Sequence, residues 1–432
     1  MTRFEIINVD ALEILDSRGR PTLSVHIGLA DGSTGWAGVP SGASTGSREA
    51  VELRDHEDDS RYGGAGVLKA VGSVEGEIAR LLRRCGWTSL AEVDEALVEL
   101  DGTDDKSRLG ANAIVGVSMA LARALAAREG GLLYEYLVSE QVAPRLPVPH
   151  FNVLNGGVHA ANPLDFQEFM IAPMCATSMS EAVQIGAEVY AALRRRLAAE
   201  GQTTTLGDEG GFAPQLTDPE EALALLVTAT ENAGYTPGLR GVAIALDPAA
   251  SEFREPDGSY RVGRARLSTS ELIKRYAVMI EDYPIWSIED GLAEDDEDGW
   301  HSLTGRLGDR IQLVGDDNFV TNPKIIKSAI ERGIGNAALI KLNQIGTVTE
   351  TLQAIALCRD GGYAQMISHR SGETHDDFIA DLAVAAGCGQ IKSGAPARGE
   401  RVAKYNRLLE IAAHDPHLPF GLPGVISRRH AF

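Results

Sequence analysis

The sequence is poor in positive charge, and it has no long apolar run. The 40 basic residues, against 61 acidic ones, give a formal net charge of −21, which argues against a nucleic-acid or anionic-membrane partner. No uncharged apolar stretch reaches the ~20 residues needed to span a bilayer, and the first residues do not resemble a signal peptide. We therefore expect a cytoplasmic protein.

Cysteine is scarce as well. The four cysteines are scattered along 432 residues and form no C-x-x-C pair. So few cysteines in a chain of this length exclude a disulfide scaffold. We expect each of them to be a buried thiol that packs as a small apolar residue: Cys85, Cys175, Cys358 and Cys388.

Length and periodicity predict two domains. The hydrophobic content of 44% is typical of globular chains. Residues 5–36 have the pattern of strands and hairpins, and from about residue 66 to 128 the apolar spacing becomes helical, which predicts a small α+β unit. The proline-rich segment 144–149 cannot continue a helix. We place the boundary beside it, between an N-terminal α+β domain of residues 1–139 and a second domain of residues 140–432.

Beyond the boundary the chain repeats one pattern, a short apolar run that ends in a polar residue and precedes a helical segment. The intervals between the run ends are 42, 27, 25, 28 and 23 residues, and the ends are Asp247, Glu289, Asp316, Lys341, His369 and Lys392. Such intervals fit one strand, one loop and one helix, the unit of a parallel α/β barrel. Because all strands of such a barrel run the same way, we expect these end residues to meet in one pocket.

Three of the run ends are carboxylates: Asp247, Glu289 and Asp316. Their mutual repulsion predicts a cation between them, and oxygen-only ligands favour Mg²⁺. Alternatively, each carboxylate caps the helix that follows it. Two further run ends are Lys341 and Lys392, and a lysine whose pKa is lowered by neighbouring cations can act as a general base. The alternative for each lysine is a surface position with its ammonium in solvent.

Other segments carry groups for proton transfer and anion binding. Arg370 and Ser371 follow His369 and suit a phosphate or carboxylate, although an arginine there can equally pair with a barrel carboxylate. Acidic groups occur in Gly207-Asp208-Glu209-Gly210-Gly211 and in Gln167-Glu168-Phe169, and one histidine, His159, lies in the loop 155–159. Paired carboxylates in a closed site can produce a general acid, whereas solvated acids in a turn have no such role.

Together these motifs resemble the enolase (phosphopyruvate hydratase) family. The matching segments cover essentially the whole chain in the family's order: VPSGASTG (39–46), SRLGANAI (107–114), GDEGGFAP (207–214), SIED (287–290), VGDD (314–317), KLNQIGT (341–347), SHRSGET (368–374) and IKSGAPAR (391–398). The resemblance implies an α/β fold in which an N-terminal α+β domain precedes an enolase-type (β/α)8 barrel. It also implies a homodimer or homo-octamer.

The resemblance further implies a reaction and two Mg²⁺ ions in each active site. The first ion would be held by the three carboxylates Asp247, Glu289 and Asp316, and the second by Ser41 in the SGASTG loop. Lys341 would take the proton from carbon 2 of 2-phosphoglycerate, and Glu209, assisted by Glu168, would protonate the hydroxyl that leaves carbon 3. The remaining predicted site residues would line the leaving-group side or bind the substrate: His159, His369, Gln167, Lys392, Arg370 and Ser371.

Several positions depart from the family pattern. Arg20, Arg48 and His375 replace other residue types near the motifs, and each can add positive charge near the pocket; Glu297 and Asn318 stand where the family usually has apolar residues. These departures raise an alternative, an enolase paralogue of phosphonate biosynthesis such as carboxyphosphonoenolpyruvate synthase, which acts on a modified substrate.

Two further alternatives come from other classes. Gly42 to Gly46 matches G-x-S-x-G, the nucleophile elbow of serine hydrolases, with Ser44 as the nucleophile. The elbow needs a strand that runs directly into the serine, whereas Pro40 and Ser41 precede it here. A non-catalytic binding protein is the other alternative, and the full set of catalytic residue types argues against it.

Overall fold

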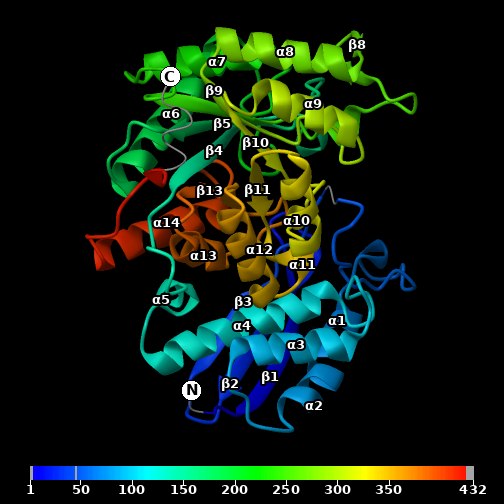
Figure 1. Ribbon diagram of the computed structural model, residues 1–432. Helices are drawn as coiled ribbons and strands as arrows, with labels where there is room; N and C mark the ends of the chain where they lie inside the picture. Colours follow the sequence, from blue (N-terminus) through cyan, green and yellow to red (C-terminus); the bar gives the residue numbers. More distant parts are fainter. Residues whose placement is uncertain (1–2, 44–45, 425–432) are drawn as a thin grey trace.

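The computed structural model describes residues 3–43 and 46–424 of the chain. The first part is an antiparallel sheet of three strands, β1 (Ile6–Leu15), β2 (Pro21–Leu29) and β3 (Thr34–Gly38), in the order β1-β2-β3. Helices α3 (Leu90–Asp101) and α4 (Ala111–Glu129) lie beside this sheet (Figure 1). Gly35 permits the close approach, since a Cβ there would lie 2.1 Å from the carbonyl oxygen of Ala120 in α4.

The rest of the N-terminal part is short and helical. It contains η1 (Tyr62–Gly64), α1 (Leu68–Ser73), the π-helical turn η2 (Val74–Ile78), α2 (Ala79–Leu82) and α5 (Leu133–Leu137). Helix α4 is buried along most of its length because it packs between the sheet and the second part of the chain. Strands followed by helices agree with the α+β unit expected there.

The second part is a closed barrel of eight strands. The strands are β4 (Val148–Asn155), β5 (Glu168–Pro173), β6 (Val242–Asp247), β9 (Ile285–Glu289), β10 (Gln312–Gly315), β11 (Ala337–Ile340), β12 (Ala364–Ser368) and β13 (Gln390–Lys392). Alternate residues face inward, so that Ala243 and Ala245 lead to Asp247, and Ala337 and Leu339 lead to Lys341. This alternation explains why the polar run ends point into the barrel.

The expectation that all eight strands run in the same direction is wrong for β5. This strand pairs antiparallel with both β4 and β6, whereas the other neighbouring pairs are parallel. The connection from β4 to β5 holds only the short turn η3 (Gly157–His159) and no crossover helix, so the chain has to return antiparallel. As a result Glu168, the first residue of β5, lies opposite Asp247, the last residue of β6. The reversed strand thus brings its acidic start to the end of the barrel where the other strands finish.

Helices surround the barrel. They are α6 (Met179–Ala199), α7 (Pro219–Asn232), α8 (Thr269–Asp282), α9 (Glu297–Leu307), α10 (Pro323–Arg332), α11 (Leu342–Ile345), α12 (Val348–Asp360), α13 (Phe378–Ala386) and α14 (Gly399–His414). The turn η4 (Ala250–Phe253) and the hairpin β7 (Tyr260–Val262) and β8 (Ala265–Leu267) lengthen the connection between β6 and β9. This insertion accounts for the longest interval in the sequence, 42 residues.

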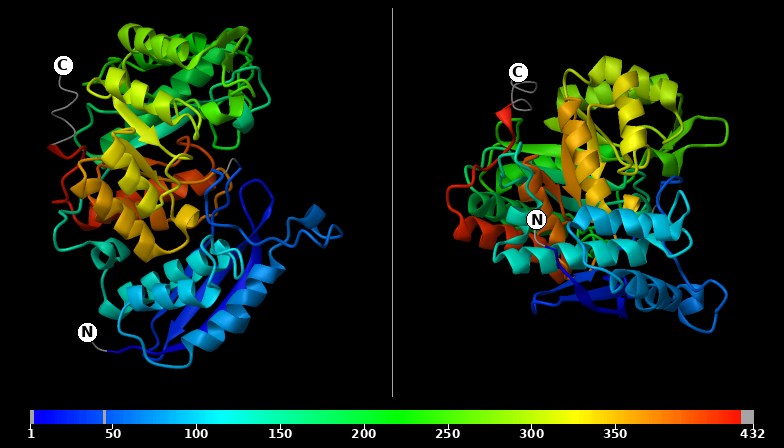
Figure 2. Two further views of the ribbon diagram at one scale, coloured as in Figure 1. Left: turned by 45° about the vertical axis from the view of Figure 1, so that its right-hand side comes forward. Right: turned by 60° about the horizontal axis from the view of Figure 1, so that its bottom comes forward.

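The N-terminal part lies against one end of the barrel (Figure 2). Ser41 forms an antiparallel bridge with Gly372. Asn343 donates to the carbonyl oxygen of Pro40, and the guanidinium of Arg123 in α4 pairs with Asp376 at 2.7 Å. The N-terminal part therefore contributes to the surroundings of the strand ends.

Two expectations about the surface can be compared with the structure. Cys358 and Cys388 are buried as expected, but Cys85 and Cys175 are exposed, so the expectation of four buried thiols is wrong for two of them. Both exposed cysteines lie just beyond the end of an element, Cys85 after α2 and Cys175 after β5. Among the described residues, no helix is long and apolar enough to cross a membrane.

Candidate active site

The predicted site residues gather where the barrel strands end. The ammonium of Lys392, at the end of β13, lies 2.7 Å from Oε1 of Glu289, 3.2 Å from Oδ2 of Asp247 and 3.2 Å from Oε1 of Glu168. Burial lowers the pKa of Lys392, but these carboxylates outweigh the burial and raise the pKa well above its ordinary value. Lys392 is therefore a fixed positive charge at the centre of the site.

Lys341 lies beside Asp316 and forms an ion pair with its Oδ2. Burial lowers the pKa of Lys341, but the Asp316 carboxylate raises it more, so the net shift is upward. The upward shift arises because the nearest charge is the Asp316 carboxylate, whereas the lowered pKa that we expect from the sequence belongs to a lysine beside a divalent cation. Gln344 donates to the other oxygen of Asp316 at 2.8 Å and holds the pair in place.

The chemistry of the predicted carboxylate ligands suits a hard cation. Glu289 Oε2 is buried and has no hydrogen-bond partner among the described residues, and burial together with Asp247 raises the pKa of Glu289 well above its ordinary value. A buried oxygen in this state favours a positive charge next to it. The donor atoms of the predicted ligands are all oxygens, which is the preference of Mg²⁺.

The predicted metal triad is not gathered into one tight group. Lys392 lies between Asp247 and Glu289, while Asp316 pairs with Lys341. A different set, Asp290, Asp316 and Asp317, brings three ligand atoms within 4.8 Å of one another. Burial and the neighbouring Asp316 raise the pKa of Asp317 to about 8. The negative charge of this set is therefore not balanced by neighbouring positive groups.

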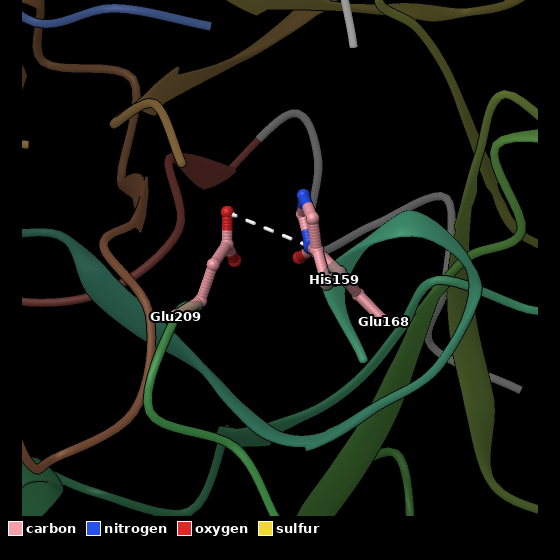
Figure 3. Close-up of side chains that lie close together, drawn as sticks. All are labelled: His159, Glu168 and Glu209. Carbon is pink, nitrogen blue, oxygen red and sulfur yellow. Dashed lines mark ion pairs between the residues drawn. The ribbon is translucent and has the colours of Figure 1, made fainter. Parts of the chain in front are cut away.

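A second acidic group consists of Glu168, Glu209 and His159 (Figure 3). The Nδ1 atom of His159 lies 3.8 Å from an oxygen of each glutamate. Burial and the Glu209 carboxylate raise the pKa of Glu168 well above its ordinary value. Burial also raises the pKa of Glu209, but His369 and His159 outweigh it and hold the pKa well below its ordinary value. The pKa values of the two carboxyls thus shift in opposite directions, which favours the protonated form at Glu168 and the ionised form at Glu209.

His369 and Asn152 complete the surroundings of Glu209. Asn152 in β4 donates to Oε2 of Glu209 at 2.9 Å, and Nε2 of His369 lies 3.2 Å from the same oxygen. Burial lowers the pKa of His369 to about 3, so its ring is neutral. Gln167, beside Glu168, is buried too, and its Oε1 atom lacks a hydrogen-bond partner within the described part of the chain.

Arg370 is buried, but its guanidinium is turned to protein groups. It donates to both oxygens of Glu49, at 2.9 and 3.1 Å, and to Oδ1 of Asn343 at 2.8 Å. The hydroxyl of Ser371 accepts from the backbone N–H of Ala43. A carboxylate of the N-terminal part thus occupies the fork that we expected to hold a phosphate.

The hydroxyl of Ser41 is held by side chains of the N-terminal part. Its hydroxyl donates to Oε2 of Glu52 at 3.0 Å and accepts from Arg54 at 2.8 Å. The role of Ser41 as a ligand of a second Mg²⁺ therefore stays a prediction. Ser44, the nucleophile of the hydrolase alternative, lies outside the described residues.

The departures from the family pattern do not add charge to the site. Arg20 and His375 are exposed, and Arg48 is exposed and donates to the carbonyl oxygen of Asn318. Glu297 pairs with Arg332 at the surface, at 2.6 Å. The expectation of extra positive charge at the pocket is therefore wrong, because these side chains end in solvent or on backbone oxygens.

Several residues of the site were missed by the sequence reasoning: Glu49, Asn152, Asn343, Gln344 and Arg401. Three of them lie in or directly beside motifs that were recognised, namely KLNQIGT and the run after IKSGAPAR. Their positions in these motifs were the available signal. Asn152 and Glu49 carry no comparable signal, because only the folded chain shows which oxygens they contact.

Comparison with known proteins agrees with this geometry. The family model described as "Enolase, N-terminal domain" matches residues 6–137, and the model described as "Enolase, C-terminal TIM barrel domain" matches residues 143–415. The chain belongs to the enolase family. It is also 57% identical, over 409 residues and 94% of each chain, to a protein named enolase from Rubrobacter xylanophilus. The enolase-type barrel that the motifs predicted is confirmed, and the protein is an enzyme of the carbon–oxygen lyase class to which this family belongs.

Proposed function

We propose that this protein catalyses the reversible, Mg²⁺-dependent dehydration of 2-phosphoglycerate to phosphoenolpyruvate, the reaction of glycolysis, in the cytoplasm. One observation carries the proposal. A lysine beside Asp316, Lys341, and two buried carboxyls whose pKa values shift in opposite directions, Glu168 and Glu209, lie where the barrel strands end. Loss of water from adjacent carbons needs such a base and such an acid.

The residues divide the reaction between them. The Nζ atom of Lys341 takes the proton from carbon 2, and the electron pair of that bond passes into the substrate carboxylate. Lys392 stabilises the charge that develops there, because its ammonium is fixed in a buried site. The Glu168–Glu209 pair then gives its proton to the hydroxyl on carbon 3, which leaves as water while the carbon–carbon double bond forms. In the reverse direction the ionised Glu209 takes a proton from water.

Asp247, Glu289 and Asp316 are the residues that would hold Mg²⁺, and Ser41 is the candidate ligand for a second ion. When bound, Mg²⁺ supplies positive charge that offsets these carboxylates, favours an uncharged Lys341 and stabilises the enolate-like charge. The unpartnered oxygen of Glu289 and the shifted pKa of this residue support the assignment.

Arg370 and Ser371 would hold the substrate phosphate. Their present partners are the Glu49 carboxylate and the backbone N–H of Ala43, and both contacts have to give way when phosphate binds. His159, His369 and Gln167 would line the leaving-group side. We also propose that the protein works as a homodimer or homo-octamer, as the resemblance to the family implies.

The test is direct. Purified protein with Mg²⁺ and 2-phosphoglycerate should form phosphoenolpyruvate, followed by its ultraviolet absorbance, and a chelator should stop the reaction. Lys341→Ala serves as the control for traces of host enzyme. A barely detectable rate in the wild type, together with turnover of a phosphonate-bearing analogue, would contradict the proposal in favour of the paralogue.

A further inference from the structure

Arg401, in the first turns of α14, is a fully buried arginine that the proposed reaction does not use. Its guanidinium reaches two loops of the site at once. Nη1 contacts Nδ1 of His369 at 2.5 Å and donates to the carbonyl oxygen of Arg370 at 2.6 Å. Nη2 donates to the carbonyl oxygens of Ser371, at 2.6 Å, and Asp208, at 3.3 Å.

These contacts determine which nitrogen of His369 carries the proton. A guanidinium has N–H donors and no acceptor. Nδ1 of His369 must therefore accept from Arg401, and the proton of the neutral ring lies on Nε2. This Nε2 is the atom that lies 3.2 Å from Oε2 of Glu209. The opposite tautomer would place a lone pair against that carboxylate and an N–H against the guanidinium.

We infer that Arg401 is a positioning residue, which fixes the Nε2–H tautomer of His369 and thereby keeps a hydrogen-bond donor facing Glu209. The catalytic effect of this contact concerns the protonation of the hydroxyl on carbon 3, and that effect rests on the proposed function. The tautomer itself does not depend on the substrate.

The effect on Glu209 follows from its neighbours. The charged and titratable groups that face the His369–Glu209 contact are Arg401, His159, Glu168 and Lys392. An N–H on Nε2, 3.2 Å from Oε2 of Glu209, favours the ionised form of Glu209 over the protonated form. Arg401 also donates to the backbone carbonyls of Asp208, Arg370 and Ser371. It thereby holds the loop that carries Glu209 in a fixed position relative to the loop that carries Arg370 and Ser371.

The first test reads the tautomer in the wild-type protein. Selective ¹⁵N labelling of histidine and a long-range ¹H–¹⁵N spectrum distinguish a protonated ring nitrogen from an unprotonated one. The signals of His369 are those that disappear in His369→Gln. We expect protonated Nε2 and unprotonated Nδ1 at neutral pH. A protonated Nδ1 overturns the inference, and this result needs neither an active enzyme nor a folded Arg401 variant.

The second test removes the guanidinium. Arg401→Met should give a mixture of tautomers and lower kcat about 100-fold, the scale of a misplaced general acid–base group, with little change in KM. Lys404→Met is the matched control, because Lys404 lies on the same helix, is equally buried and donates to Glu373 and to the Thr374 carbonyl, but does not contact His369. An equal loss of kcat in both variants would show a merely structural role.

A third measurement separates this inference from the proposed function. Exchange of the carbon 2 proton of 2-phosphoglycerate with deuterated solvent reports on Lys341 alone. In Arg401→Met we expect this exchange to continue at the wild-type rate while phosphoenolpyruvate formation falls about 100-fold. Loss of both reactions in the variant contradicts the inference, whereas absence of both in the wild type contradicts the proposed function and leaves the tautomer result standing.

Discussion

Buried glutamine side chains near one end of the barrel are paired by hydrogen bonds, whereas several buried oxygens at the other end have no hydrogen-bond partner among the described residues. Near the starts of the strands, Gln312 and Gln390 exchange two hydrogen bonds across the interior, at 2.8 and 2.9 Å, and Gln312 also donates to Ser287. At the other end, buried oxygens of Gln167, Glu168 and Glu289 have no hydrogen-bond partner among the described residues. An unpaired buried polar group costs roughly 1–3 kcal/mol, so the fold gives up stability at the end where chemistry is expected.

This difference indicates which end of the barrel can bind a ligand. Paired groups such as the two glutamines contribute to stability and have no capacity left for a ligand. Glu168 and Glu289 each pair with Lys392 through one oxygen, whereas the second oxygen of each has no hydrogen-bond partner among the described residues. Such an oxygen is unfavourable by itself and becomes favourable when a cation and an anionic substrate are present. Substitutions at the two ends of the barrel should therefore affect activity and stability differently.

The largest effect is expected from Lys341→Ala. Removal of the base should lower kcat about 10³-fold, the range of a general base, while the far-ultraviolet circular dichroism stays that of the wild type. The measurement is phosphoenolpyruvate absorbance at saturating Mg²⁺ and 2-phosphoglycerate. Substantial residual activity would remove Lys341 from its proposed role.

Glu289→Gln should separate function from stability. The raised pKa of Glu289 means that its ionised form is unfavourable in the fold, so its contribution to stability falls as pH rises above the ordinary glutamate value. We expect the variant to be more stable than the wild type in chelator at neutral pH, by about 1 kcal/mol, and to be inactive. Glu373→Gln, which breaks the paired contact with Lys404 at 2.8 Å, is the control and should be less stable.

The paired end should behave in the reverse manner. Gln312→Ala leaves the amide of Gln390 without its partner and should lower the free energy of unfolding by about 1–3 kcal/mol, with kcat unchanged. The double variant Gln312→Leu with Gln390→Leu should be closer to the wild type, because both polar groups are gone. Chemical denaturation measures the free energy of unfolding of both variants. A loss of activity in Gln312→Ala would contradict the claim that the glutamine pair contributes to stability alone.

The smallest effect concerns a contact between the N-terminal part and the barrel. Asp94 in α3 accepts from the backbone N–H and the hydroxyl of Thr349, and burial raises the pKa of Asp94 to about 6. The folded state therefore binds this proton more tightly than the unfolded state, and the stability it contributes is lost as pH rises from about 4 to about 6. Asp94→Asn should flatten the stability profile in this window, measured by denaturation at several pH values.

The sequence predicted the barrel, because run ends such as Asp247 and Lys341 recur at intervals that fit one strand and one helix. It did not predict the reversal of β5, since the spacing of apolar residues carries no information on strand direction. The predicted residue types of the site lie together, but their partners were not foreseen. The contact of Glu49 with Arg370 joins residues 321 positions apart, and the contact of Arg401 with His369 joins residues 32 positions apart. Only tertiary packing brings these side chains together.

The most direct test of the account is the midpoint of thermal unfolding with and without Mg²⁺ plus 2-phosphoglycerate, in the wild type and in Glu289→Gln. Ligands that bind only the folded state raise this midpoint. We predict a clear rise for the wild type and little or none for Glu289→Gln. An equal rise in both proteins, or no rise in the wild type, would contradict the claim that the carboxylate oxygens without hydrogen-bond partners belong to the ligand site.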